Sequence, residues 1–458
     1  MKTILLAATA TLALASAAQA QDPHAGHAMG GQHTPTGDGP GAADPHAGHD
    51  MGGMTAPAAA APVDIHEHEM LATGGMTSAL GPFPMSRDGS GTAWQPDASP
   101  HMGGMAHHGE WMTMSHALLN VVYSDQGGPR GDDKAFLAGM VMGMAQRPLG
   151  AGTLGLRAML SPDPFMGAKG YPLLLAAGES ADGKTPLIDR QHPHDLFMEL
   201  SASYSLPVGE RGSLLLYGGL PGEPAYGPAS FMHRLSALDS PEAPITHHWL
   251  DSTHITFGVL TAGYVQGDWK IEASRFRGRE PDEKRYDIET GALDSTAARV
   301  SWNPTRNWSL QASWADIKSP EALEPHHDEI RFSASGAYVR RLDSGGLIAA
   351  TLAVSQKNRQ PGPILWGYLA EAAWAPNDAW TLFTRAEQID ADELAGGHGS
   401  PPVTVGKLSV GVVRDWQVRP GVKLGLGGLV SAFDIPGALG TSYGEPSAGM
   451  VFVRLKVG

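Results

Sequence analysis

The sequence predicts an all-β protein, a transmembrane antiparallel β-barrel of the outer-membrane type with about 16 strands and a disordered N-terminal arm. Three observations predict this fold. An export signal opens the chain, apolar and polar residues alternate in short segments from residue 114 onward, and short and long connections alternate between these segments. The expected regions are therefore a signal peptide (1–20), the arm (21–113) and the barrel (114–458).

The composition limits the chemistry that the chain can perform. Its 458 residues include 20 His and 19 Met but no Cys, and the net charge is -15. A chain without Cys forms neither a disulfide nor a thiolate metal site. The acidic balance argues against a nucleic-acid partner, which would need a basic surface. Any soft-metal binding must therefore use Met sulfur and His nitrogen.

The first 20 residues have the pattern of a secretory signal peptide. Lys2 precedes a short apolar run from Ile4 to Ala18, and Ala18-Gln19-Ala20 forms an A-x-A cleavage site. A membrane anchor is the alternative, but a run of about 15 residues is shorter than the ~20 that a spanning helix needs. We expect cleavage after Ala20 and export from a bacterial cytoplasm.

Residues 21–113 are dominated by Gly, Ala, Pro, His and Met, and they lack helical or strand periodicity, which predicts disorder. The sequence Asp-Pro-His-Ala-Gly-His at 22–27 recurs at 44–49. Eleven of the 20 His and ten of the 19 Met lie between residues 21 and 116. A passive linker would use Ser, Glu or Lys instead, so this composition indicates a further role.

His and Met together favour soft-metal binding, because thioether sulfur selects Cu(I) and imidazole suits both oxidation states of copper. Flexible repeats with few ligands each favour many exchangeable sites, so no tightly bound cofactor is expected. Loose binding of zinc or nickel, and a linker without any metal, are the alternatives. The arm residues predicted to bind copper, or silver in its place, are His24, His27, Met29, His46, His49, Met51, Met54, His66, His68, Met70, His101, Met102, Met105, His107 and His108.

The barrel strands are predicted from a period of two, as in 306–316, where Trp, Leu and Ala alternate with Ser and Gln. Most segments run ten or more residues, close to the length that crosses a bilayer at a tilt. The expected strands are 114–125, 134–147, 151–161, 194–207, 212–220, 252–265, 268–279, 293–303, 306–316, 328–342, 346–357, 362–375, 379–391, 402–417, 421–432 and 446–458.

The connections between these segments alternate between short turns and mostly longer loops, as in outer-membrane barrels with short periplasmic turns. A soluble β-sandwich or a β-helix is the alternative, but neither explains this alternation. With an even strand number both ends of the barrel, and hence the arm, fall in the periplasm. The Trp residues beside the short turns are the expected interfacial girdle: Trp269, Trp302, Trp308, Trp374, Trp380 and Trp416.

Nine further His lie beyond residue 117, each in or beside a connection assigned to the outer side, and without a matching surplus of Met. Three clusters of them have adjacent carboxylates, which orient metal-bound imidazoles. An ordinary loop role is the alternative. The candidates for a metal-binding outer mouth are His192, His194, His247, His248, His254, His326 and His327.

The side of the strands that faces the lumen is expected to be polar. A barrel near this size leaves an aqueous channel unless something fills it. The arm and the connection 221–251 are the candidates for such a plug. The charged residues expected to face the lumen are Glu199, Glu272, Arg299, Arg331, Arg385 and Lys407.

A His- and Met-rich secreted arm followed by a barrel resembles the copper-resistance B-type outer-membrane proteins. The parts that carry the resemblance are the signal peptide, the duplicated Asp-Pro-His-Ala-Gly-His sequence and the alternating strands. The resemblance implies copper sequestration or export across the outer membrane. It places metal ligands only on the His and Met of the repeats named above.

The leading hypothesis is an outer-membrane barrel that binds copper and supports metal tolerance or transport, with its arm in the periplasm. Its expected partners are outer-membrane lipid, metal ions and periplasmic copper proteins, and the oligomeric state is left open. The alternative is a general porin or solute channel with a passive linker arm. No nucleophile lies in a recognisable local motif with a base, so enzymatic activity is not expected.

Overall fold

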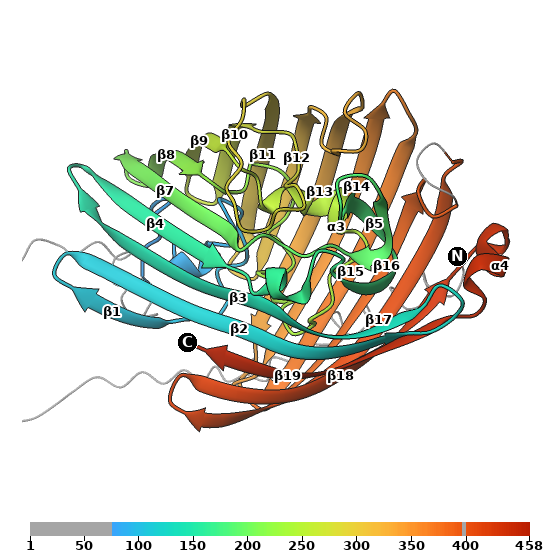
Figure 1. Cartoon of the computed structure of the whole chain (residues 1–458). Helices are drawn as coiled ribbons and strands as arrows, with labels where there is room; N and C mark the ends of the chain where they lie inside the picture. Colours follow the sequence, from blue (N-terminus) through green and yellow to red (C-terminus); the bar gives the residue numbers. More distant parts are fainter. Residues whose placement is uncertain (1–75, 396–399) are drawn as a thin grey trace, which may run out of the picture.

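The computed structural model describes residues 76–395 and 400–458. Sixteen antiparallel strands form a closed barrel (Figure 1). Consecutive barrel strands pair as neighbours, and the last strand, β19, closes the ring on the first, β2. Closure removes the unpaired edges that an open sheet would present to lipid.

The barrel strands are β2 (Trp111–Gln126), β3 (Asp132–Leu149), β4 (Gly152–Leu160), β7 (Phe197–Val208), β8 (Gly212–Gly219), β9 (Val259–Gln266), β10 (Trp269–Phe276), β11 (Ser295–Thr305), β12 (Trp308–Ile317), β13 (Asp328–Arg341), β14 (Leu347–Gln360), β15 (Ile364–Asn377), β16 (Trp380–Ala391), β17 (Val403–Arg419), β18 (Val422–Asp434) and β19 (Ser447–Val457). The remaining elements are β1 (Gly104–His108), β5 (Tyr171–Ser180), β6 (Pro186–Gln191), the helices α3 (His247–Leu250) and α4 (Gly440–Tyr443), and the 3-10 helices η2 (Met85–Arg87), η3 (Asp163–Met166), η4 (Ser252–His254) and η5 (Gly437–Leu439). No helix in the described residues is long and apolar enough to cross a membrane.

All sixteen expected strands are present, which confirms the predicted fold class. One boundary is wrong by several residues: β9 begins at Val259, whereas 252 was expected. Residues 252–258 belong instead to the loop before the strand. There the amide of Thr256 donates to the carbonyl of Gly222, and residues 252–254 form η4.

The seven predicted short turns join β3–β4, β7–β8, β9–β10, β11–β12, β13–β14, β15–β16 and β17–β18. The six Trp residues predicted beside these turns all lie on the outer surface, between 37% and 51% exposed. Trp269 and Trp302 stack with their rings 4.8 Å apart. A girdle of this kind marks the lipid–water interface at the turn end of an outer-membrane barrel.

The two faces of the barrel wall differ as the alternation predicts. Outward-facing positions are apolar, as with Leu352, Val430 and Val451, which are about half exposed or more. Every one of the six charged residues predicted to face the lumen is buried. An apolar outer face and a polar inner face indicate a barrel in the outer membrane.

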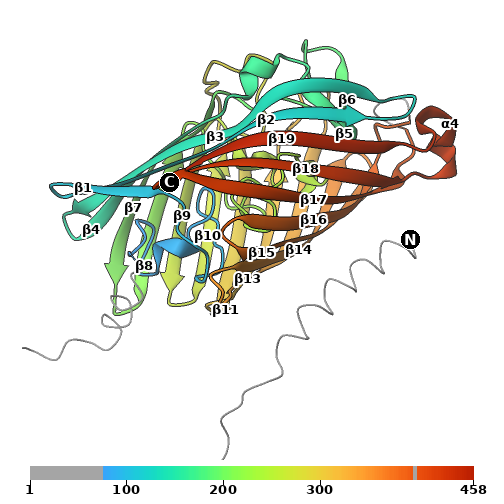
Figure 2. The same ribbon diagram turned by 90° about the horizontal axis from the view of Figure 1, so that it is seen from below.

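Three segments of the chain lie in the lumen: the N-terminal plug, the inner hairpin and the central loop (Figures 1 and 2). The N-terminal plug is residues 76–100, which contain η2. The inner hairpin is residues 161–196, which contain η3, β5 and β6. The central loop is residues 220–258, which contain α3 and η4. The predicted plug at 221–251 therefore lies inside the barrel, and the inner hairpin joins it.

The expected arm differs from the structure between residues 76 and 113. The N-terminal plug is held in the lumen by Arg87, whose guanidinium pairs with Asp97 at 2.6 Å and donates to the carbonyl of Gly267 in the β9–β10 turn. After the plug, β1 pairs with the start of β2. Composition alone predicted disorder here, but partners on the barrel wall supply the contacts that this segment cannot make by itself.

The apolar outer face gives a test of membrane insertion. Val430→Arg, in the middle of β18, should destabilise the barrel by about 2–4 kcal/mol, because a charge at the bilayer midplane is costly. Val418→Arg, beyond Trp416 at the turn end of β17, should cost only about 0–1 kcal/mol. Urea unfolding in lipid vesicles, followed by Trp fluorescence, measures both. Equal costs at the two positions would contradict the assigned membrane band.

Candidate metal centre

Five His residues from two lumenal segments meet inside the barrel. His192 and His194 follow β6 in the inner hairpin, whereas His247 and His248 begin α3 and His254 ends η4 in the central loop. All five are buried. Ring centroids of neighbouring pairs lie 5.0–6.2 Å apart. The two His clusters that lie far apart in the sequence thus form one group.

Three members of this group have the geometry of a metal site. One ring nitrogen from each of His194, His247 and His254 lies within 4.8 Å of the others. A tetrahedral ion bonded at ~2.1 Å would hold such nitrogens about 3.4 Å apart, so the rings need to close by at most about 1.4 Å. Three His ligands leave a fourth position for water or another ligand, as in open metal sites.

The Nδ1 atom of each of these three rings already has an oxygen acceptor. Nδ1 of His194 donates to Asp163 at 2.8 Å, and Nδ1 of His247 donates to Asp251 at 2.7 Å. Nδ1 of His254 donates to the backbone carbonyl of Asp251 at 2.7 Å. These acceptors fix the tautomer, so the lone pair falls on Nε2. Nε2 of His194 and of His254 is buried without a hydrogen-bond partner.

Asp251 connects the centre to the barrel wall. Its second carboxylate oxygen accepts a hydrogen bond from Arg234 at 2.6 Å, and Arg234 donates to Glu371 on β15 at 3.0 and 3.1 Å. Burial by itself would raise the pKa of Asp251, but Arg234 and the bond from His247 outweigh burial and hold that pKa below its usual value. The carboxylate is therefore ionised and suited to balance the charge of a bound cation.

The imidazoles of His247 and His254 are kept neutral by their surroundings. Burial lowers the pKa of His247. Burial also lowers the pKa of His254 to well below its usual value, and the nearby rings of His194 and His247 add to this effect. The neutral ring is the form that binds metal. At neutral pH a cation would therefore displace few protons from this site.

His192 and His248 flank the three-His group. Nδ1 of His192 lies 3.3 Å from Glu179, and Nδ1 of His248 lies 3.9 Å from Glu280. Gly178 makes room for His248, because a Cβ at this position would lie 2.7 Å from Cε1 of the ring. The ring of His192 lies 6.2 Å and the ring of His248 lies 5.4 Å from the ring of His247, measured between centroids.

The other predicted ligands lie elsewhere. His326 is exposed, and Nδ1 of His327 bonds Glu324 at 2.9 Å, away from the five-His group. Met105, His107 and His108 are exposed on the β1–β2 hairpin, and His101 and Met102 are half-buried before it. The predicted ligands outside the described residues are His24, His27, Met29, His46, His49, Met51, Met54, His66, His68 and Met70.

The expectation of an outer mouth for the loop His is wrong for the five-His group, which is buried in the lumen. The cause is that both connections fold inward to meet charged groups on the wall. Sequence reasoning also missed Asp163 and Arg234, which carry no local signal. Asp251 lies between His248 and His254 in one of the three predicted His clusters, and its spacing of four residues from His247 could have suggested the pairing.

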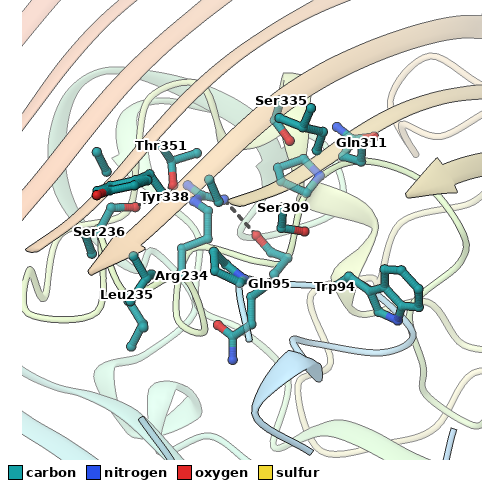
Figure 3. Close-up of a pocket in the computed structure, with 18 residues that line it drawn as sticks. Trp94, Gln95, Arg234, Leu235, Ser236, Ser309, Gln311, Ser335, Tyr338 and Thr351 are labelled. Carbon is teal, nitrogen blue, oxygen red and sulfur yellow. Dashed lines mark hydrogen bonds between the residues drawn. The ribbon is translucent and has the colours of Figure 1, made fainter. Parts of the chain in front are cut away.

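Two cavities that adjoin the central loop are small. One of them, of about 30 Å³, lies between the N-terminal plug, the central loop and the wall. Figure 3 shows its lining, with Trp94, Arg234 and Tyr338 among the labelled residues. A second cavity, of about 50 Å³, is lined by His194, Met140 and Met232 among others. Such volumes hold a few water molecules. An ion fits in them, but an organic solute does not unless the loops move.

The oriented rings give a test of the centre. Asp251→Asn should weaken metal binding at the His group about 10–100-fold, the usual effect of losing a carboxylate that orients a ligand. Asp239→Asn is the matched control, because Asp239 is in the same loop but bonds Arg454 at 2.5 Å. Co²⁺ titration of the full chain, followed by visible absorption, measures the tetrahedral site. Equal affinity in Asp251→Asn and the parent would contradict the assigned geometry.

No known protein family and no curated protein matches the chain. Solved structures similar to it include OmpF of Salmonella typhi in complex with daunomycin (9% identity, TM-score 0.48, covering 77% of this chain and 100% of that one). An anion-selective porin from Comamonas acidovorans is 12% identical (TM-score 0.47, 76% and 100%). The channel DcaP of Acinetobacter baumannii is 8% identical (TM-score 0.45, 78% and 100%). With its closed sixteen-strand ring, apolar outer face and polar lumen, the chain has a porin-like outer-membrane barrel fold.

Proposed function

We propose that this porin-like barrel handles a transition-metal ion, which it binds in its lumen at His194, His247 and His254. The observation that carries the proposal is the set of three buried rings whose Nδ1 atoms are all held by oxygen acceptors. These acceptors hold all three rings in the tautomer that leaves the lone pair on Nε2 for a metal. The two carboxylates behind the rings, from Asp163 and Asp251, favour a divalent ion because they offset its charge.

Copper is the first candidate for the metal, with silver as a substitute at the softer sites. Imidazole ligands bind Cu(II), Zn²⁺ and Ni²⁺, and of these three ions Cu(II) is bound with the highest affinity. The His and Met of the arm support copper over zinc, because thioethers select Cu(I). The arm would raise the copper concentration at the periplasmic mouth, and periplasmic copper proteins would exchange metal there. The barrel would thereby support metal tolerance or transport.

A general porin with a passive linker arm is the second candidate. The fold itself favours it, since a closed sixteen-strand barrel with a polar lumen is the architecture of solute channels. The three lumenal segments argue against it, because the two cavities that adjoin the central loop, lined by Arg234 and by His194 respectively, have room for water or ions only. A general channel therefore needs these segments to move aside.

Bilayer recordings separate the two candidates. In the parent protein, adding Cu²⁺ should reduce the ion current, because the bound metal narrows the path and adds positive charge. The reduction should be lost in His194→Gln with His254→Gln, and kept in the control His327→Gln, whose ring is outside the group. A steady current that copper leaves unchanged in the parent would favour the general channel.

The role of the arm has a separate test, and the structure defines its boundary. Deleting residues 21–75 removes the two repeats but keeps the N-terminal plug, which contacts the β9–β10 turn. The full chain should bind several more Cu(I) ions than the deletion variant, measured by competition with a Cu(I) chelator. Equal binding by the two proteins would show that the arm is a passive linker.

A further inference from the structure

A second buried cluster in the lumen is made of Met residues. Met140, Met142, Met159 and Met198 are at most 4% exposed, and Met144 and Met232 pack against them. They come from β3, β4, the start of β7 and the central loop. In the sequence the second His population has no matching surplus of Met. Strand pairing nevertheless gathers Met residues that are spread over about 90 positions of the chain.

Two Met residues of the cluster and one His form a continuous row across three strands, and both residue types can serve as metal ligands. His116 on β2 lies directly opposite Met142 on β3, and Met142 lies directly opposite Met159 on β4. Opposite residues on paired strands point to the same face, and neighbouring strands are about 4.8 Å apart. All three side chains therefore lie side by side on the lumenal face.

A second imidazole reaches this row from the central loop. Nε2 of His233 lies 3.4 Å from Sδ of Met159. His233 is buried, and the turn that carries it is fixed by the backbone bond from its own amide to the carbonyl of Ser230. Two thioethers and two imidazoles thus belong to one small region of the lumen.

Apolar packing explains the Met residues but not His116. Both ring nitrogens of His116 are buried, and neither has a hydrogen-bond partner in the described part of the chain. Leaving a buried polar group unpaired costs about 1–3 kcal/mol. A residue chosen only for packing would have no nitrogen at this position. A cation bound to the ring would supply the missing partner.

We propose that His116, Met142, Met159 and His233 form a second metal site, which takes a soft monovalent cation, Cu(I) or Ag(I). Thioether sulfur is the ligand type that selects Cu(I). The site is separate in residues and in chemistry from the group of His194, His247 and His254. It does not depend on that group binding metal.

The surrounding charges fit a monovalent ion. Asp163 and Asp251 hydrogen-bond to ligands of the three-His group, whereas no carboxylate hydrogen bond to His116 or His233 is found among the described residues. The nearest acid along the row is Glu199, opposite Met159 on β7, and its carboxylate accepts hydrogen bonds from Tyr217 and Ser201. With four neutral ligands, a single positive charge is less costly to bury than two.

Anomalous diffraction from crystals of the full chain locates each ion directly. Crystals grown with Ag⁺ should show a silver peak between Met142, Met159 and His233. Crystals grown with Zn²⁺ should show the zinc peak at the three-His group and none at the Met row. The readout is positional, so metal held by the arm does not confuse it. Silver found only elsewhere, or zinc on the Met row, would overturn the proposal.

A matched pair of variants tests the thioethers in solution. Met142→Leu with Met159→Leu conserves volume and apolar character, so the barrel should still fold. Met450→Leu, at a buried lumenal position on β19 outside the cluster, is the control. Native mass spectrometry should find one fewer Ag⁺ on the double variant than on the parent, and no change in the control. Equal silver counts in all three proteins would refute the site.

If the double variant does not refold, His233→Gln replaces it, because the ring sits on a loop and not on the barrel wall. The loss of one Ag⁺ without loss of Co²⁺ at the three-His group supports the proposal. Retention of the full silver count in His233→Gln, together with no silver peak on the Met row of the parent, overturns it. Failure of Co²⁺ binding in the parent would instead count against the proposed function alone.

Discussion

Charge pairing inside the lumen is the constraint on which the rest of this structure depends. Ionised side chains on the inner wall are shielded from water, and an unpaired buried charge costs several kcal/mol. Arginines of the wall and the central loop avoid this cost. Each bonds an acidic side chain and, at the same time, a polar group that lies across the contact between wall and loop. Examples are Arg234 with Glu371 and Asp251, Arg299 with Glu272 and the carbonyl of Gly227, Arg331 with Glu329 and Ser252, and Arg454 with Asp415 and Asp239.

This pairing has a direct consequence for the His centre. Because Arg234 bonds Glu371 on the wall and Asp251 on the loop, the loop has one position, and the two His acceptors supplied by Asp251 are fixed with it. The inner hairpin then brings His194 against them, with Asp163 behind its ring. The same interactions that neutralise the lumen thus orient the rings, so structural and functional demands on Asp251 coincide.

The two proposed sites differ in the chemical softness of their ligands. The three-His group combines imidazole with nearby carboxylates, whereas the Met row combines imidazole with thioether. A cavity lined by His194 of the first group, and by Met140 and Met232 of the buried Met cluster, has room for an ion with a few waters. A barrel with both sites could hold both oxidation states of one metal, each at the ligands that suit it. Of the fifteen arm residues predicted to bind copper, ten lie outside the described residues, and the other five, which lie on or before the β1–β2 hairpin, belong to neither proposed site.

The local pattern of the chain was sufficient for the barrel. The sixteen strands, the seven short turns, the Trp girdle and the six lumenal charges all follow from a period of two, because side chains on a strand alternate between lipid and lumen whatever lies far away in the sequence. The candidate ligands of the His centre were also legible as residue types in clusters. Their location in the lumen could not be predicted in the same way, because the sequence placed these residues at the outer mouth of the barrel.

Only the tertiary structure decided what fills the lumen. The inward folding of the central loop, the order of residues 76–100 and the gathering of His116, Met142, Met159 and His233 all depend on contacts between segments remote in sequence. Such contacts are selected by charge pairing and strand register around a closed ring, and neither leaves a local signal. The sequence by itself therefore determined the wall of the barrel, while the closed ring determined which side chains meet inside it.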